Sequence, residues 1–140
     1  TNAMTDAQIR GMNLFFSDRT NCSTCHSGFN FTNYAFENNG LYIQYADIGR
    51  MRLTLKEEDM ALFKVPGLRN IEMTGPYMHD GSIQTLQQVI DHYQSGGMDH
   101  PHKNPILKPL DLTTPEQKDL IEFLKALTDD TFLTNPIFKY

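Results

Sequence analysis

Apolar residues recur at helical spacing in three segments of the chain, and a helix-start signal precedes each one. In the first segment Thr5 and Gln8 form a capping-box pair ahead of a helix that should end near Asp18. The apolar face expected for this helix consists of Ile9, Met12 and Phe16. The pattern therefore predicts a helix that delivers the chain to Cys22.

The second segment repeats the signal with Thr85 and Gln88, and Gly96 and Gly97 should end its helix. The apolar positions that follow the i, i+3, i+4, i+7 pattern are Leu86, Val89, Ile90 and Tyr93. Because it belongs to this face, the Tyr93 side chain is predicted to point inward.

The third segment begins at Thr114, with Pro115 at the first helical position and Gln117 at the third. Its buried stripe should consist of Leu120, Ile121, Leu124 and Leu127. We expect this helix to close the domain by packing against the first one.

The segments between these helices lack any sustained period. Residues 28 to 53 are rich in Asn, Gly and Tyr, and residues 100 to 110 carry three prolines, which forbid a regular element. Long loops in a compact domain usually surround something. No alternating run predicts a convincing strand, so the fold class is expected to be all-α.

Composition narrows the class of protein further. The 140 residues fit one domain, and they are 39% hydrophobic with nine Phe, six Tyr and no Trp, which makes a lean core. The net charge is -5 with Lys and Arg scattered singly, which argues against nucleic acid or an anionic membrane as a partner. No apolar run approaches the roughly 20 residues that span a bilayer.

The two cysteines of the chain, Cys22 and Cys25, are followed at once by His26. A thioredoxin-like redox pair would need an α/β chain, and a zinc site would need two further ligands at a spacing that the histidines do not offer. A disulfide across so short a loop would add little stability. In C-x-x-C-H, two thioethers attach a haem and the adjacent imidazole ligates its iron, so covalent c-type haem attachment is the leading interpretation.

A second group of motifs lies downstream. The stretches "CSTCHSG", "FKVPGLRN", "TGPYMHDGS" and "TLQQVIDHY", followed by "LTTPEQKDLIEFLKALT", resemble the C-terminal haem domain of the bacterial di-haem cytochrome c peroxidase and MauG family. The resemblance covers roughly residues 5 to 128. It implies a cytochrome c-like domain whose helices and long loops wrap one covalently attached haem.

The resemblance also implies a domain organisation and partners. Residues 1 to 4 would be an expression remnant or linker, and residues 5 to 140 the C-terminal half of a two-domain protein. In this family peroxide is cleaved at the N-terminal haem and the C-terminal haem relays electrons. The expected partners are therefore the missing N-terminal haem domain and a small donor such as a cytochrome or cupredoxin. The implied location is the periplasm. Whether the protein forms a homodimer is left open.

The ligand on the far side of the haem decides the chemistry. In classical peroxidases of the family a Met stands at the position of Tyr93, whereas MauG-type members resemble this chain and use Tyr. A phenolate ligand favours ferric iron, whereas a Met thioether ligand raises the reduction potential of the haem. Met98 is the rival ligand, and Met78 is expected to line the pocket. With Met98 on the iron the chain would instead be a free-standing mono-haem electron carrier.

The remaining candidates surround this site. Arg69 and Arg50 are candidates for the haem propionates because a guanidinium matches a carboxylate. The resemblance implies that the carbonyls of Thr74 and Pro76 contribute to an interdomain calcium site, which this chain alone would leave incomplete. His79 is expected to make a structural or haem-edge contact, and the other three histidines, His92, His100 and His102, are expected to be solvated.

Overall fold

The computed structural model describes residues 4–138, and helices and loops make up most of this part of the chain. The helices are α1 (Asp6–Phe15), α2 (Cys22–Cys25), α3 (Met51–Thr54), α4 (Leu86–Ser95), α5 (Thr114–Lys125) and α6 (Asp130–Thr134). Three 3-10 turns, Glu57–Asp59, Ile71–Met73 and Pro136–Phe138, complete the helical elements. The strands β1 (Phe36–Glu37) and β2 (Phe63–Lys64) form one short antiparallel pair, with Phe36 opposite Lys64.

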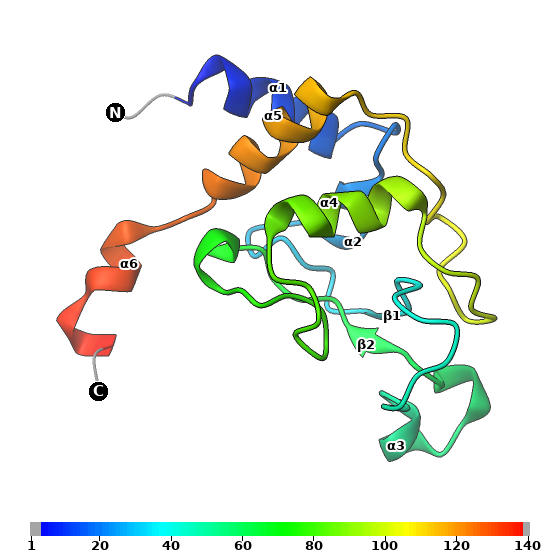
Figure 1. The fold of residues 1–140 in the computed structure, drawn as a ribbon. Coiled ribbons are helices and arrows are strands. Elements are labelled where there is room, and N and C mark those ends of the chain that lie inside the picture. Colours follow the sequence, from blue (N-terminus) through cyan, green and yellow to red (C-terminus); the bar gives the residue numbers. More distant parts are fainter. Residues whose placement is uncertain (1–3, 139–140) are drawn as a thin grey trace.

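Helices α1 and α5 pack against each other, as the sequence predicts (Figure 1). The α1 capping box is formed by Thr5 and Gln8 as expected. The α5 capping box lies one residue earlier than predicted, because Thr113 accepts from the backbone of Glu116 and Pro115 stands at the second helical position. Proline is tolerated throughout the first helical turn, so the sequence alone did not fix the register of this start.

The buried face of α1 differs from the predicted one. Ile9 and Phe16 are exposed, and the buried residues are Gly11, Leu14 and Phe15. Gly11 accounts for the difference, since a Cβ there would overlap the backbone carbonyl of Asp119 on α5. The helices approach closely along this glycine, and the side chains next to it fill the interface.

Aromatic and leucine side chains form one core under these two helices. Phe123 of α5 packs against Phe15 with ring centroids 5.2 Å apart, and Phe31 from the loop after α2 lies 6.3 Å away. The buried cluster is Leu14, Phe15, Leu68, Leu86, Ile90, Leu112, Leu120, Phe123, Leu124 and Leu127. Residues from α1, α4 and α5 thus share one core.

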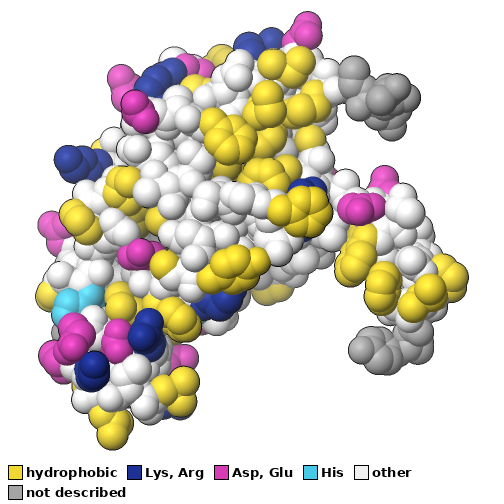
Figure 2. Space-filling view, turned by 180° about the vertical axis from the view of Figure 1, so that it is seen from behind, with side chains coloured by type: hydrophobic (Ala, Val, Ile, Leu, Met, Phe, Trp, Pro, Cys, Tyr) yellow, Lys and Arg dark blue, Asp and Glu magenta, His cyan; other side chains and the backbone are white. Residues whose placement is uncertain are grey.

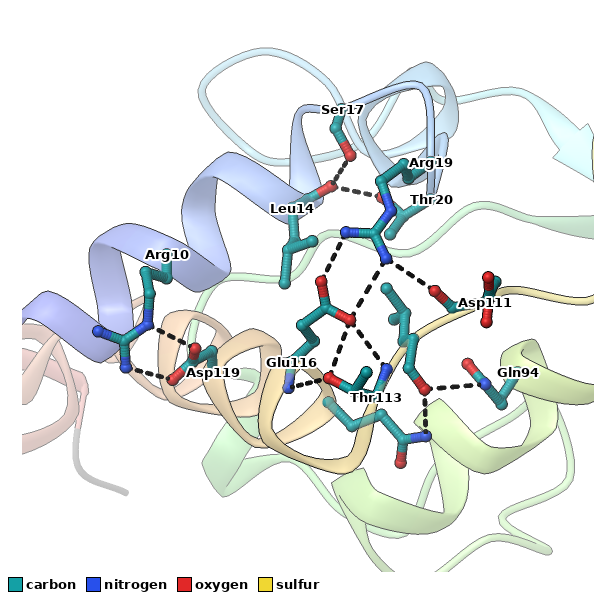
Figure 3. Close-up of polar contacts among 12 residues, drawn as sticks. Arg10, Leu14, Ser17, Arg19, Thr20, Gln94, Asp111, Thr113, Glu116 and Asp119 are labelled. Atoms are coloured by element: carbon teal, nitrogen blue, oxygen red, sulfur yellow. Dashed lines mark hydrogen bonds and ion pairs between the residues drawn. The ribbon is translucent and has the colours of Figure 1, made fainter.

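Ion pairs flank the α1 and α5 contact on its solvent side (Figure 3). Arg10 binds Asp119 at 2.7 Å, and Arg19 binds Glu116 at 2.6 Å. The Arg19 guanidinium and Thr113 are the main groups that lower the pKa of Glu116 to about 2. Both pairs are exposed, so each adds little stability but fixes how α5 is oriented.

Helix α4 lies beside α5 and carries the expected apolar face, with Leu86 and Ile90 buried. Thr85 and Gln88 form its capping box, and Gly96 ends it in the left-handed conformation. The Gln94 amide donates to the carbonyl of Leu112 at 3.1 Å, which ties α4 to the start of α5 (Figure 3). The face of α4 that includes Tyr93 is therefore held firmly.

The two ends of the described chain differ in how they contact the core. Met4 packs against the core, whereas residues 1 to 3 of the predicted remnant lie outside the described residues. At the other end α6 and the last turn extend away from the body (Figure 1). Within residues 4–138 no helix has the length and hydropathy required to cross a membrane.

Candidate functional site

The segment from Asn21 to His26 forms a single helical turn that presents both cysteines. Asn21 precedes α2 in the left-handed conformation, with φ of 54°, and the His26 amide closes the turn on the Cys22 carbonyl at 2.9 Å. Cys22 and Cys25 are three residues apart in this turn, and side chains at that spacing lie on the same face of a helix. The turn thus presents two thiols and an imidazole from adjacent positions.

Both thiols are free and half-buried. Burial raises the pKa of Cys22 and of Cys25, and the Glu37 carboxylate raises the pKa of Cys25 further. Redox-active cysteine pairs have a lowered thiol pKa, so this pair lacks the electrostatics of a thioredoxin-like site. Within residues 4–138 no three His, Cys, Asp or Glu side chains gather as a metal-ion site requires.

The His26 ring is oriented by the backbone. Its Nδ1 lies 2.9 Å from the Phe31 carbonyl, which can only accept, so Nδ1 carries the proton. Burial lowers the pKa of His26, although backbone carbonyls of Phe31 and Pro66 oppose this effect, and the ring is therefore held neutral at pH 7. In this tautomer the Nε2 lone pair is available to a metal.

Tyr93 projects from α4 toward the same turn. Burial raises the pKa of its phenol, a hydrogen bond with the Asn39 side chain opposes that rise, and the Cys22 and Cys25 thiols add to it. Burial is the largest of these contributions.

Asn39 connects the groups around Tyr93, and sequence reasoning missed it. Its side-chain amide donates to the Met78 sulfur at 3.2 Å, and its carbonyl accepts from His92 Nε2 at 3.0 Å. Met78 is held with φ of 73°, which is uncommon for a residue other than glycine. The Asn-Asn-Gly turn in the sequence indicates a bend, but only the fold shows what its side chains contact.

Met98, the rival ligand, lies differently. It is 53% exposed, and its backbone amide is bound to the Gly40 carbonyl at 2.7 Å. Tyr93 is more deeply buried than Met98, whose side chain is half in solvent. The choice between Tyr93 and Met98 as the iron ligand stays a prediction.

Comparison with known proteins adds an independent line of information. The chain is 38% identical over 120 residues to the methylamine utilization protein MauG of Methylorubrum extorquens, covering 84% of this chain and 33% of that protein. It is 33% identical to the cytochrome-c peroxidase IdrP1 of Denitromonas iodatirespirans, covering 96% and 43%. A crystal structure of a MauG-like protein associated with microbial copper homeostasis superposes with a TM-score of 0.89 at 34% identity, covering 98% and 51%. No protein-family model matches the chain.

The chain belongs to the di-haem cytochrome c peroxidase and MauG family. Its fold is that of the cytochrome c-like domains of these proteins, and membership implies a c-type haem as cofactor. The chain spans about half, or less, of the length of the relatives it matches.

The residues at the site fit the haem that this family carries. Cys22 and Cys25 supply free thiols on one face of a turn, and His26 keeps Nε2 available because Nδ1 is bound to a carbonyl. Tyr93 supplies an oxygen donor from α4. This is the donor set that a c-type haem with a tyrosine on its second face requires.

Both predicted propionate partners have other contacts. Arg50 pairs with Asp59 at 3.4 Å. The Arg69 Nε donates to the Phe29 carbonyl at 3.0 Å, and its guanidinium lies 4.3 Å from the Phe29 ring centroid. Both arginines are exposed, so their binding of propionates stays a prediction.

Thr74 and Pro76 lie on an exposed turn, where the Thr74 hydroxyl donates to the Ile71 carbonyl at 3.3 Å. Their contribution to a calcium site likewise stays a prediction.

The histidines show one confirmed prediction and one wrong one. His79 makes the expected structural contact, stacking on Phe63 with centroids 3.9 Å apart. The expectation that His92, His100 and His102 are solvated is wrong. All three are half-buried, and His102 Nδ1 binds the Met60 carbonyl at 3.0 Å. These histidines hold the loops to one another. A proline-rich segment of sequence does not reveal such contacts between loops.

Proposed function

We propose that this chain is the electron-relay half of a di-haem peroxidase or MauG-like oxidase, and that it corresponds to the C-terminal half of its relatives. It would carry one haem, attached through Cys22 and Cys25, with His26 and Tyr93 on the two faces of the iron. The observation that carries the proposal is the turn Cys22–Cys25, which presents two free thiols beside a His26 ring whose Nδ1 lies 2.9 Å from the Phe31 carbonyl. A c-type haem supplies one-electron exchange when bound.

The attachment turn supports the first part of this proposal. Raised thiol pKa values keep Cys22 and Cys25 protonated at pH 7, so they are not poised for disulfide or thiolate chemistry. The Phe31 carbonyl fixes the orientation and tautomer of His26. Such a partner behind a ligating imidazole keeps the ring in place and strengthens it as a donor.

The second part rests on Tyr93 and Asn39. Asn39 donates its side-chain amide to the Met78 sulfur, which occupies that sulfur in a hydrogen bond, and the Asn39 side chain also acts to lower the pKa of Tyr93. His26 and Tyr93 would both hold the haem iron. Peroxide would then have no open position here, which supports a relay role rather than peroxide cleavage.

The remaining features of the proposal follow from this role. A relay half needs a second haem domain that reacts with peroxide, and a small redox protein such as a cytochrome or cupredoxin as donor. The location would be the periplasm, where c-type haem proteins of this kind meet peroxide. A calcium ion between the two domains would use the carbonyls of Thr74 and Pro76.

The test compares two substitutions in the haem-loaded chain. We expect the mass of the denatured protein to exceed that of the polypeptide by one haem. We expect Tyr93→Phe to shift the ferric absorption spectrum and Met98→Ala to leave it unchanged. Tyr34→Phe is the matched control, because Tyr34 is exposed and remote from both thiols in the contacts described.

The opposite result would reject the relay assignment. A spectrum that shifts with Met98→Ala and not with Tyr93→Phe, together with a high reversible potential, would make the chain a mono-haem electron carrier. A denatured mass equal to that of the polypeptide, after production with haem-attachment machinery, would reject covalent attachment.

A further inference from the structure

Tyr42 forms a short hydrogen bond to a carboxylate near the surface. Its hydroxyl donates to Asp80 Oδ2 at 2.7 Å, and the Ser82 amide donates to the other oxygen of Asp80 at 3.1 Å. Tyr42 is half-buried and Asp80 is exposed. Among the tyrosines of residues 4–138, Tyr42 is the one whose hydroxyl donates to a carboxylate. The haem site does not use this pair.

Asp80 is placed to accept a proton when Tyr42 is oxidised. A tyrosine that loses an electron must also lose its phenolic proton, because its radical cation is a very strong acid. Burial would raise the pKa of Asp80, but hydrogen bonds from Tyr42 and Ser82 outweigh it and lower that pKa to about 2. Asp80 is therefore a carboxylate at neutral pH, and it lies within hydrogen-bond distance of the proton that it would accept.

Aromatic rings connect Tyr42 to the interior. The Tyr42 ring meets the Tyr45 ring edge-on with centroids 5.5 Å apart, and the Tyr45 ring lies 5.2 Å from that of His100. The His79 ring lies 5.6 Å from Tyr45 and stacks on Phe63 at 3.9 Å. Centroid separations below about 7 Å are those of packed aromatic pairs. Rings in such contact exchange an electron readily, because their π orbitals overlap.

Tyr45 leads from this cluster toward the haem site. Its hydroxyl donates to Asn38 Oδ1 at 3.3 Å, and Asn39, the next residue, donates to the Met78 sulfur at 3.2 Å. An amide oxygen accepts a proton far less readily than a carboxylate, so Tyr45 lacks the proton acceptor that Tyr42 has. An oxidising equivalent that passes through Tyr45 should therefore settle on Tyr42, where the proton can leave.

The aromatic cluster reaches solvent. The loop that carries both tyrosines leads into α3 (Figure 1), and Figure 2 shows hydrophobic or aromatic, histidine and acidic side chains gathered at the end of the molecule that holds α3. His79 and Asp80 are exposed, and Tyr42 is half-buried. An electron donor outside the protein can therefore approach Tyr42 closely.

We propose that Tyr42 is a redox-active relay residue that carries an oxidising equivalent from the haem site to the surface, with Tyr45 as the intermediate ring and Asp80 as the proton acceptor. This inference rests on the proposed function, in which the oxidised haem is the oxidant. Tyr42 gives one electron to that oxidant through Tyr45, its O–H bond breaks, and the proton forms a new O–H bond on Asp80. The products are a neutral Tyr42 phenoxyl radical, a protonated Asp80 and an oxidant reduced by one electron. A one-electron donor at the surface then reduces the radical, and Asp80 returns the proton.

The first experiment oxidises the haem-loaded chain with ruthenium(III) tris(bipyridine) produced by a light flash. A nitroso spin trap adds covalently to tyrosyl radicals, so mass spectrometry of peptides locates them. We expect adducts on Tyr42 to exceed those on Tyr34 by at least about tenfold, because a positioned proton acceptor has effects of that size or more. Tyr34 is 57% exposed and its hydroxyl accepts from Asn30, so access alone would favour Tyr34.

Asp80→Asn tests the proton acceptor, because the amide can still accept a hydrogen bond but is not a base. We expect the radical yield on Tyr42 to fall by at least about tenfold in this variant. In the native chain the oxidation of Tyr42 should be slower in deuterium oxide than in water. Asp47→Asn is the matched control, since Asp47 is an exposed carboxylate of the same loop that pairs with Arg52, and it should keep the native yield. Circular dichroism at neutral pH should show a folded chain in both variants.

A second measurement tests the path between Tyr42 and the haem. The same flash is applied to the chain with ferrous haem, and the haem absorbance reports how fast the haem replaces the electron that Tyr42 has lost. We expect Tyr42→Phe and Tyr45→Phe each to slow the oxidation of the haem. Tyr34→Phe should leave that rate unchanged.

Three results would overturn the inference. The first is a yield of adducts on Tyr34 that equals or exceeds the yield on Tyr42. The second is a Tyr42 yield that Asp80→Asn leaves unchanged. The third is haem oxidation at the native rate in Tyr42→Phe or in Tyr45→Phe. The proposed function is judged separately, because the denatured mass and the Tyr93→Phe spectrum involve neither Tyr42 nor Asp80.

Discussion

The α1 and α5 region and the region around Tyr93 are held together in different ways. Between α1 and α5, Phe15, Leu120 and Phe123 are almost fully buried, and apolar contact supplies the stability. Around Tyr93, Asn38 and Asn39 make hydrogen bonds that link loops to α4 and to the 77–83 turn. One region makes its own core, and the other depends on single polar side chains.

This difference indicates how the site is organised. A region that packs by itself tolerates little change in volume, whereas a region tied by asparagines can surround a group that is not part of the chain. Asn38 is fully buried, binds the Ala61 carbonyl at 3.0 Å and accepts from the Gly40 amide at 2.8 Å. Substitutions in each region should test this difference, and we expect the largest loss of stability in the helical region.

The largest effect should come from Phe123→Ala in the helical region. Phe123 is 3% exposed and touches the rings of Phe15, Phe16 and Phe31. Its truncation should lower the free energy of unfolding by about 3–5 kcal/mol, measured by urea denaturation. Leu53→Ala, at an exposed position, should change it by no more than about 0.5 kcal/mol. Equal losses in the two variants would contradict a core centred on Phe123.

The next effect should come from Asn38→Ala in the loop region. The change leaves the Ala61 carbonyl and the Gly40 amide without their partner in a buried position. We expect a loss of about 1–3 kcal/mol in the free energy of unfolding. Asn13→Ala, an exposed asparagine on α1, serves as the control and should be nearly neutral. If both variants unfold at the same urea concentration, polar contacts do not hold this region.

Asn39→Ala should have a smaller effect on stability and a distinct effect on the site. It removes the hydrogen bond to the Met78 sulfur, which should cost about 1 kcal/mol. In the haem-loaded chain we expect the ferric spectrum to change, because Met78 is released and the Asn39 side chain no longer lowers the pKa of Tyr93. Asn13→Ala, at an exposed position on α1, should leave the spectrum unaltered. A native spectrum in Asn39→Ala would remove Asn39 from the site.

The smallest effect on stability should appear only at acidic pH. Hydrogen bonds from Arg19 and Thr113 lower the pKa of Glu116 to about 2. Burial would raise the pKa of Asp80, but hydrogen bonds from Tyr42 and Ser82 outweigh it and lower the pKa to about 2. A carboxylate whose pKa is lower in the folded state stabilises above its unfolded pKa, and this stability is lost as pH falls toward 2.

One such carboxylate lies in each region, so the two can be compared directly. Melting temperatures between pH 5 and pH 2 should fall less steeply in Glu116→Gln and in Asp80→Asn than in the native chain. Asp6→Asn is the control at an exposed position, and it should follow the native curve. If the melting temperature of Glu116→Gln falls between pH 5 and pH 2 as steeply as that of the native chain, the Arg19 pair does not contribute to stability.

Much of the fold was predictable because its signals are local. The capping boxes at Thr5 and Thr85 and the stop at Gly96 are where the sequence predicts them, since a cap depends on residues within one turn. The start of α5 was predicted one residue late, because Thr113 and Thr114 are both competent caps. The buried face of α1 was predicted only in part, because Met12 packs against the core but Ile9 and Phe16 are exposed where the helix approaches α5 along Gly11.

The candidate site was predictable only in part. The spacing of Cys22, Cys25 and His26 predicts haem attachment without any knowledge of the fold. Asn39 was not predictable, because its importance lies in contacts with Met78 and Tyr93 from distant parts of the chain. The half-buried histidines of the loops were missed for the same reason.

The sequence by itself determined the starts of α1 and α4, the C-x-x-C-H pattern and the family resemblance, because each is carried by residues near one another along the chain. Only the tertiary structure decided that Tyr93 is more deeply buried than Met98, which stays half in solvent. It also decided that α6 and the turn Pro136–Phe138 extend away from the body (Figure 1). The physical reason is that proximity and burial depend on how the helices pack, and no local pattern encodes that packing.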